Sequence, residues 1–130
     1  MKNIIIILLI LIFPITIYGI LTNKTENNIV LAQNANLATL KIYSSTMCLD
    51  CQKLKKEMQD IEIDYKDQIN IQKFNALENS KKIQDDISKY EITLVPTMIF
   101  ITKDGETRKK IEGYIPKEEI IKEIESTING

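Results

Sequence analysis

Apolar and polar residues follow one another along most of the chain with the periods of strands and helices. Apolar or β-branched runs predict four strands, at residues 37–43, 69–74, 98–101 and 107–112. Apolar residues three or four positions apart predict three amphipathic helices, at residues 52–61, 83–90 and 116–128. Asp104-Gly105 is a favoured hairpin turn and joins the last two strands. The predicted order is β-α-β-α-β-β-α, in which helical crossovers give a parallel first half and the hairpin gives an antiparallel second half.

The N-terminal segment has a different pattern. Residues 4–21 carry no charge, and eighteen residues of helix would be about 27 Å long, close to the thickness of a bilayer's hydrocarbon core. We favour an uncleaved transmembrane anchor, with secretion after signal cleavage as the alternative, because no good cleavage site directly follows the apolar run. Lys2 precedes this run, so the positive-inside rule places the rest of the chain outside the cytoplasm.

This pattern divides the chain into three parts. We expect an anchor or signal segment at residues 1–22, a linker rich in Asn and Thr at residues 23–36, and a folded α/β domain at residues 37–130. An extracytoplasmic domain with one pair of cysteines suits a compartment in which disulfides persist.

Composition removes several functional classes. The chain has 17 basic and 18 acidic residues, so there is no electrostatic reason to expect a nucleic-acid partner. It has no histidine, which excludes Ser-His-Asp and Cys-His catalysis and imidazole metal ligation. Its 2 cysteines cannot complete a four-ligand zinc site by themselves. We therefore expect neither a metal nor a cofactor.

The segment Cys48-Leu49-Asp50-Cys51 holds both cysteines, between a predicted strand and a predicted helix. Cysteines three positions apart at the start of a helix can bridge each other, with Cys48 facing solvent and Cys51 facing inward. The free amides of the first turn stabilise a thiolate there, while the negative charge of Asp50 opposes it. A purely structural disulfide is the alternative, but a loop this short constrains little of the unfolded chain. The pattern therefore favours thiol–disulfide chemistry.

Four features in this order resemble the thioredoxin family. They are the strand–Cys48-Leu49-Asp50-Cys51–helix unit, the segment Val95-Pro96-Thr97 that opens a strand, the hairpin turn at Asp104-Gly105, and Gly113 before the last helix. The resemblance covers roughly residues 37–130. It implies a thioredoxin-like three-layer α/β/α fold with a mixed central sheet, here preceded by the N-terminal transmembrane helix.

The resemblance also implies roles for individual residues. Cys48 would be the attacking thiolate and Cys51 the resolving thiol. Pro96 would follow a cis peptide bond opposite the cysteines, the backbone of Val95 would pair with an extended substrate segment, and Gly113 would let that segment approach.

Other positions depart from the family's usual residues. Met47 replaces the usual tryptophan beside the first cysteine and would contact substrate, and Ile42 occupies the position of a buried acid. Lys73 would match the family's buried lysine and would modulate the site, as would Asp50.

Together these features predict a thiol–disulfide oxidoreductase that acts on protein disulfides outside the cytoplasmic membrane. A strong oxidant has a reduced form that is stabilised as a thiolate. The negative charge of Asp50 should disfavour that thiolate, so we expect a reductant. Its partners would be a protein that carries a disulfide or dithiol and a membrane dithiol carrier that donates electrons. The alternative is a membrane-tethered binding module that uses a groove at Met47, Val95 and Tyr114 without turnover.

Overall fold

The computed structural model describes residues 37–130, so the predicted anchor (1–22) and linker (23–36) lie outside the described residues. The elements follow the predicted order: β1 (Ala38–Ser44), α2 (Leu49–Asp64), β2 (Ile69–Asn75), α3 (Lys81–Lys89), β3 (Thr97–Ile101), β4 (Thr107–Glu112) and α4 (Lys117–Ile128). The helix α2 extends beyond the predicted run at both ends. Among residues 37–130 no helix has the length and apolar character that crossing a membrane requires.

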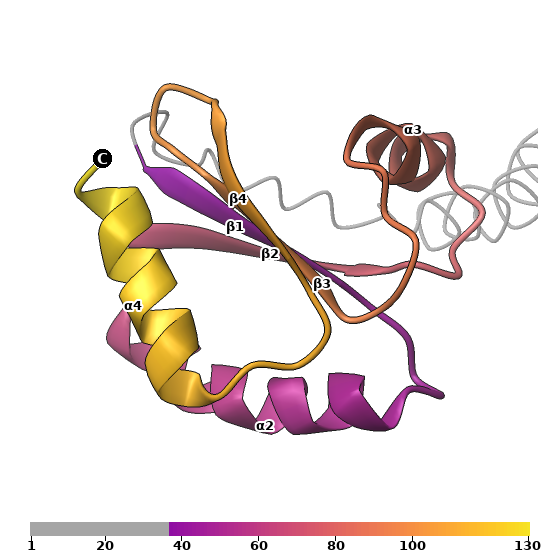
Figure 1. The fold of residues 1–130 in the computed structure, drawn as a ribbon, viewed down its shortest axis with the longest axis horizontal. Helices are drawn as coiled ribbons and strands as arrows, with labels where there is room; N and C mark the ends of the chain where they lie inside the picture. The colour runs from indigo at the N-terminus through magenta and orange to yellow at the C-terminus, as the bar shows by residue number, and fades with distance from the viewer. Residues whose placement is uncertain (1–36) are drawn as a thin grey trace, which may run out of the picture. The chain divides into compact units, whose positions relative to one another are not determined.

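The four strands form one sheet in the order β2-β1-β3-β4. The pair β1–β2 is parallel, whereas β1–β3 and β3–β4 are antiparallel. Figure 1 shows α2 and α4 on one side of this sheet and α3 on the other. The predicted mixed sheet and three-layer arrangement are therefore confirmed.

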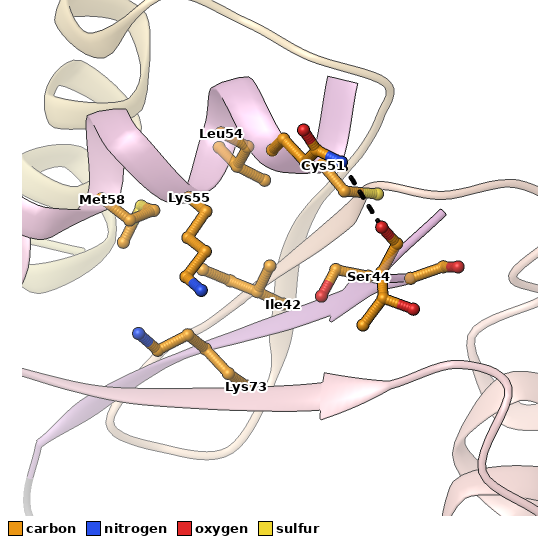
Figure 2. A pocket seen from close by; sticks show the side chains of 10 residues that line it. Ile42, Ser44, Cys51, Leu54, Lys55, Met58 and Lys73 are labelled. Atoms are coloured by element: carbon orange, nitrogen blue, oxygen red, sulfur yellow. Dashed lines mark hydrogen bonds between the residues drawn. The ribbon is translucent and has the colours of Figure 1, made fainter. Parts of the chain in front are cut away.

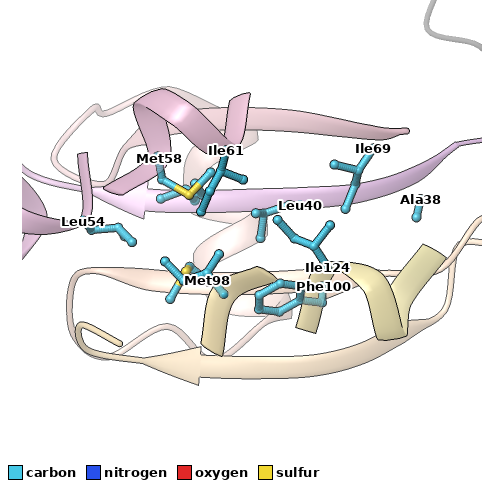
Figure 3. Close-up of a cluster of buried hydrophobic side chains, with 11 residues drawn as sticks. Ala38, Leu40, Leu54, Met58, Ile61, Ile69, Met98, Phe100 and Ile124 are labelled. Carbon is cyan, nitrogen blue, oxygen red and sulfur yellow. The ribbon is translucent and has the colours of Figure 1, made fainter. Parts of the chain in front are cut away.

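The main core lies between the sheet and the pair α2–α4 (Figure 3). Strand β1 contributes Leu40 and Ile42 to this core, while the next residue, Tyr43, faces the opposite layer. Because both faces of β3 are covered, this strand is buried at every position, whereas β1 alternates buried Leu40 and Ile42 with the polar Thr39 and Lys41. The helix α2 contributes Leu54, Met58 and Ile61, whose spacing of four and three residues keeps them on one face.

A polar cluster attaches α3 to the sheet. Asp86 of α3 accepts hydrogen bonds from Lys41 Nζ at 2.8 Å and from the Tyr43 hydroxyl at 2.6 Å. Burial by itself raises the pKa of Asp86, but the hydrogen bonds from Lys41 and Tyr43 outweigh it and the pKa falls below its usual value. The carboxylate is thus held ionised at the boundary between two layers.

Replacing Asp86 by asparagine should destabilise the domain by about 1–3 kcal/mol, because Lys41 then loses its counter-ion in a mostly buried place. Since the pKa of Asp86 is lowered in the folded state, its contribution is complete at neutral pH. The contribution is lost as the pH falls below about 4 toward the folded-state pKa. Urea unfolding of both proteins at neutral and acid pH measures this difference.

The neighbouring Asp85 supplies a matched control. It pairs with Lys81 on the exposed face of α3, so Asp85→Asn should change stability by less than about 1 kcal/mol at any pH. Equal effects of the two substitutions would contradict the role given to Asp86.

Candidate active site

Both cysteines lie at the N-terminus of α2, directly after the loop that leaves β1. Cys48 is the N-cap residue, and its Sγ accepts a hydrogen bond from the Cys51 backbone N–H at 3.1 Å. Both cysteines are free thiols; Cys48 is half-buried, whereas Cys51 is only 5% exposed. The first cysteine therefore faces outward and the second inward. Ser44 ends β1, Ser45 and Thr46 lie in the loop, and none of the three caps the helix.

A second segment, directly before the start of β3, contacts Cys48. The Cys48 Sγ–H donates to the carbonyl oxygen of Val95 at 3.5 Å. The Val95–Pro96 peptide bond is cis, as the resemblance implied. The hydroxyl of the fully buried Thr97 donates to the Leu94 carbonyl at 2.7 Å and holds the start of β3 in place.

Gly113 joins the same group through the backbone. Its N–H donates to the Pro96 carbonyl at 2.7 Å. Its φ of +90° lies in the left-handed region that favours glycine, and no atom lies within 4 Å of where a Cβ would be. The structure thus brings Cys48, Val95, Pro96 and Gly113 together from three separate segments.

The environment of Cys51 keeps its thiol protonated at neutral pH. Burial, with a smaller contribution from the hydrogen bond to Cys48, raises the pKa of Cys51 to about 11. Asp50 adds a weaker effect in the same direction. The Asp50 carboxylate is half exposed and pairs with Lys53 Nζ at 3.0 Å, so its field at the cysteines is partly compensated.

Alkylation by iodoacetamide should distinguish the two thiols of the reduced protein. The thiolate is the reacting form, so the rate at Cys51 should rise about tenfold per pH unit from about pH 7 to about pH 10, following its raised pKa. Mass spectrometry of digested samples gives the rate at each cysteine. In urea the rate at Cys51 should level off near its ordinary pKa of about 8.5. A native rate at Cys51 that levels off there too would contradict the assigned environment.

The prediction that Lys73 is buried is wrong. The register of β1 and β2 does place Lys73 beside Ile42, but the lysine side chain is about half exposed and pairs with Glu62 of α2. Ile42 offers no charge to a buried ammonium group, so the long side chain extends to a carboxylate at the surface.

Met47, predicted as a substrate contact, is 86% exposed beside Cys48, and Leu49 on the other side is 74% exposed. Two further exposed leucines, Leu77 and Leu94, lie in the loops after β2 and before β3. Because β1 and β2 end where the antiparallel β3 begins, these loops share one end of the sheet with the cysteines. We call these four side chains the apolar rim.

Sequence reasoning missed Leu77 and Leu94. The available signal was an apolar residue inside each predicted loop. The Ala76 N–H donates to the Ser44 carbonyl at 2.9 Å, which ties the loop of Leu77 to the end of β1. Tyr114, expected in the groove of a binding module, instead donates its hydroxyl to Glu57 of α2 at 3.2 Å.

Comparison with known proteins agrees with this fold. The profile of the thioredoxin-like domain family matches residues 25–128. A thioredoxin of Staphylococcus saprophyticus is 32% identical over 81 residues, covering 62% of this chain and 73% of its own. A thioredoxin of Staphylococcus aureus is 30% identical over 76 residues, covering 58% of this chain and 68% of its own.

Two solved structures share the fold. The first is chloroplastic thioredoxin z, with a TM-score of 0.62 and 22% identity, covering 73% of this chain and 81% of that one. The second, described only as a malarial protein, has a TM-score of 0.61 and 16% identity, covering 71% of this chain and 98% of that one. The family match, which spans most of the chain, shows that this protein belongs to the thioredoxin-like domain family.

Proposed function

We propose that this protein is a thiol–disulfide oxidoreductase whose substrate is a protein disulfide. One observation carries the proposal: the half-buried Cys48 Sγ lies at a helix N-terminus, 3.1 Å from the Cys51 N–H and 3.5 Å from the Val95 carbonyl. A thiolate formed there accepts the hydrogen bond of the Cys51 amide and faces the positive end of α2. Cys51, three residues on, is within reach of whatever becomes bonded to Cys48.

The reaction proceeds in two exchanges. The Cys48 thiolate attacks one sulfur of the substrate disulfide, forms a mixed disulfide and releases the other substrate sulfur, which takes up a proton. Cys51 then loses its proton and attacks Cys48, which forms the Cys48–Cys51 disulfide and frees the second substrate thiol. The substrate gains two electrons, and the protein's dithiol loses two.

The apolar rim supports a protein substrate over a small thiol. Met47 and Leu49 flank Cys48, and Leu77 and Leu94 lie in loops at the same end of the sheet. Large exposed apolar side chains that gather in one region mark contact sites for other proteins. The exposed half of Gly113 leaves room for an extended segment beside Pro96. Val95 is the expected backbone partner of such a segment.

The double substitution Met47→Ser with Leu49→Ser should raise KM for a protein disulfide about threefold to thirtyfold, because each side chain loses apolar contact area with the substrate. The rate with a small disulfide such as cystamine should stay unchanged, since that molecule is too small to cover much of the apolar surface of the rim. Steady-state kinetics with insulin and with cystamine separates these effects.

Ile63→Ser is the control for that experiment. Ile63 is 70% exposed on α2 but lies near the helix's C-terminal end, away from the cysteines. It should leave both rates unchanged. An equal rise in KM with Ile63→Ser would show a nonspecific effect of surface polarity.

We further propose that the domain acts outside the cytoplasmic membrane as a reductant. The uncharged run at residues 4–21 and the preceding Lys2 support this location. Asp50 in the first turn of α2 supports the direction, since it disfavours the thiolate-stabilised reduced form of strong oxidants. A reductant outside the membrane needs electrons from within, so a membrane dithiol carrier is the proposed donor.

Trapping tests the function. A Cys51→Ala variant should accumulate a mixed disulfide between Cys48 and a substrate protein, visible on non-reducing gels and lost on reduction. A Cys48→Ala variant, which keeps the other cysteine, should trap nothing. Equal trapping by both variants, or by neither, would favour a tethered binding module without turnover.

A further inference from the structure

A cavity of about 470 Å³ lies beside Cys51, on the side of α2 that faces β1 and β2. Figure 2 shows Cys51, Leu54, Lys55 and Met58 of α2 above Ile42 of β1. The proposed redox chemistry does not use this cavity, because substrate reaches Cys48 from the apolar rim. Its volume is within the usual range of small-molecule sites, about 300–1,000 Å³.

The cavity has an apolar wall and a polar one. Ile42, Leu54 and Met58 form the apolar wall. Ser44, Ser45 and Thr46 line the part next to the cysteine loop. A site of this kind suits a ligand with a compact apolar body and one polar end.

Both charged side chains that line the cavity are lysines, although the Glu62 carboxylate pairs with one of them. Its lining includes Lys55 and Lys73 but no carboxylate. In Figure 2 both ammonium groups point into the space below α2, next to Ile42. Lys73 pairs with Glu62, whereas no ion pair within residues 37–130 involves Lys55. One positive charge at this opening therefore lacks a counter-ion among the described residues.

We infer that this cavity binds a small organic carboxylate. The carboxylate group would lie between Lys55 and Lys73, and the apolar body would lie against Ile42 and extend toward Cys51. A neutral molecule would lack the attraction of the exposed Lys55 ammonium group, and a cation would be repelled by it. Binding at this site does not require the proposed redox reaction, although a ligand bound there lies against Cys51, the proposed resolving thiol.

The test uses the full chain in detergent micelles, reduced, with phenylacetate and phenylacetamide as probes. These molecules share an apolar body and differ in charge. NMR titration should show saturable shifts at the amides of Cys51, Lys55 and Ile42, with phenylacetate binding about threefold to tenfold more tightly than the amide. Phenylacetate should also slow the alkylation of Cys51 by iodoacetamide.

Substitutions of single lysines test whether Lys55 binds the carboxylate group of the probe. Lys55→Gln should remove the preference for phenylacetate, and Lys55→Arg should keep it. Lys66→Gln, which changes an exposed lysine beyond the end of α2, should have no effect. Equal affinities for the two probes, shifts confined to other surfaces, or the same loss with Lys66→Gln would each overturn the inference.

Discussion

Replacing Cys48 by serine is expected to abolish turnover in an insulin-reduction assay with dithiothreitol as the electron donor. A hydroxyl cannot form the nucleophilic thiolate, nor can its oxygen take the place of the mixed-disulfide sulfur that Cys51 attacks. The fold should survive, because Cys48 is the N-cap residue of α2 and serine is among the preferred residues at that position. Loss of activity would therefore report chemistry rather than unfolding.

Two measurements accompany this prediction. Circular dichroism and urea unfolding of Cys48→Ser should match those of the unaltered protein. Ser45→Ala, in the loop before the cysteine, should retain activity, since the hydroxyl that it removes accepts a hydrogen bond from the exposed Met47 amide and not from a cysteine. Full activity in the Cys48→Ser protein would rule out the assigned role.

Replacing Phe100 by alanine is expected to cost about 3–5 kcal/mol of unfolding free energy. Phe100 is fully buried at the centre of β3, paired in register with Leu40 and packed in the core below α4. Removal of its ring leaves a cavity that the close-packed side chains around it cannot readily fill. A domain of this size has about 5–15 kcal/mol in total, so the variant should be close to its folding limit.

Urea unfolding followed by circular dichroism gives the free energies directly. Ile63→Ala, which truncates an exposed apolar side chain on α2, should change stability by less than about 1 kcal/mol. A cost below about 1 kcal/mol for Phe100→Ala would mean that the layer between the sheet and α4 is packed differently.

The local pattern of apolar and polar residues was sufficient to predict the strands and helices of this fold. Strand β3 is buried at every position, so it appears in the sequence as a nearly continuous apolar run, whereas β1 alternates buried apolar residues with Thr39 and Lys41. The stripe Leu54, Met58 and Ile61 predicted α2 because one face of that helix is buried. The strand order β2-β1-β3-β4 was not predicted, since periodicity does not specify which strands pair and the resemblance to the thioredoxin family implied only a mixed central sheet.

The details of the site depend on tertiary contacts that no local pattern contains. The side chain of Lys73 extends outward because Glu62, eleven residues earlier, offers a carboxylate at the surface. Cys48 became the helix cap through its bond to the Cys51 amide, although the preceding Ser and Thr have higher capping preferences. The side chains of the apolar rim come from separate loops, which lie at the same end of the sheet only because the strands pair as they do.

The reduction potential of the Cys48–Cys51 pair tests the central claim most directly. The reduced and oxidised forms can be quantified by thiol alkylation and mass spectrometry after equilibration in glutathione or dithiothreitol buffers. The proposed function predicts a reversible two-electron transition between about −270 and −120 mV, with a reductant toward the lower end. No reversible transition in that range would contradict a catalytic dithiol and leave the pair a structural feature of a binding domain.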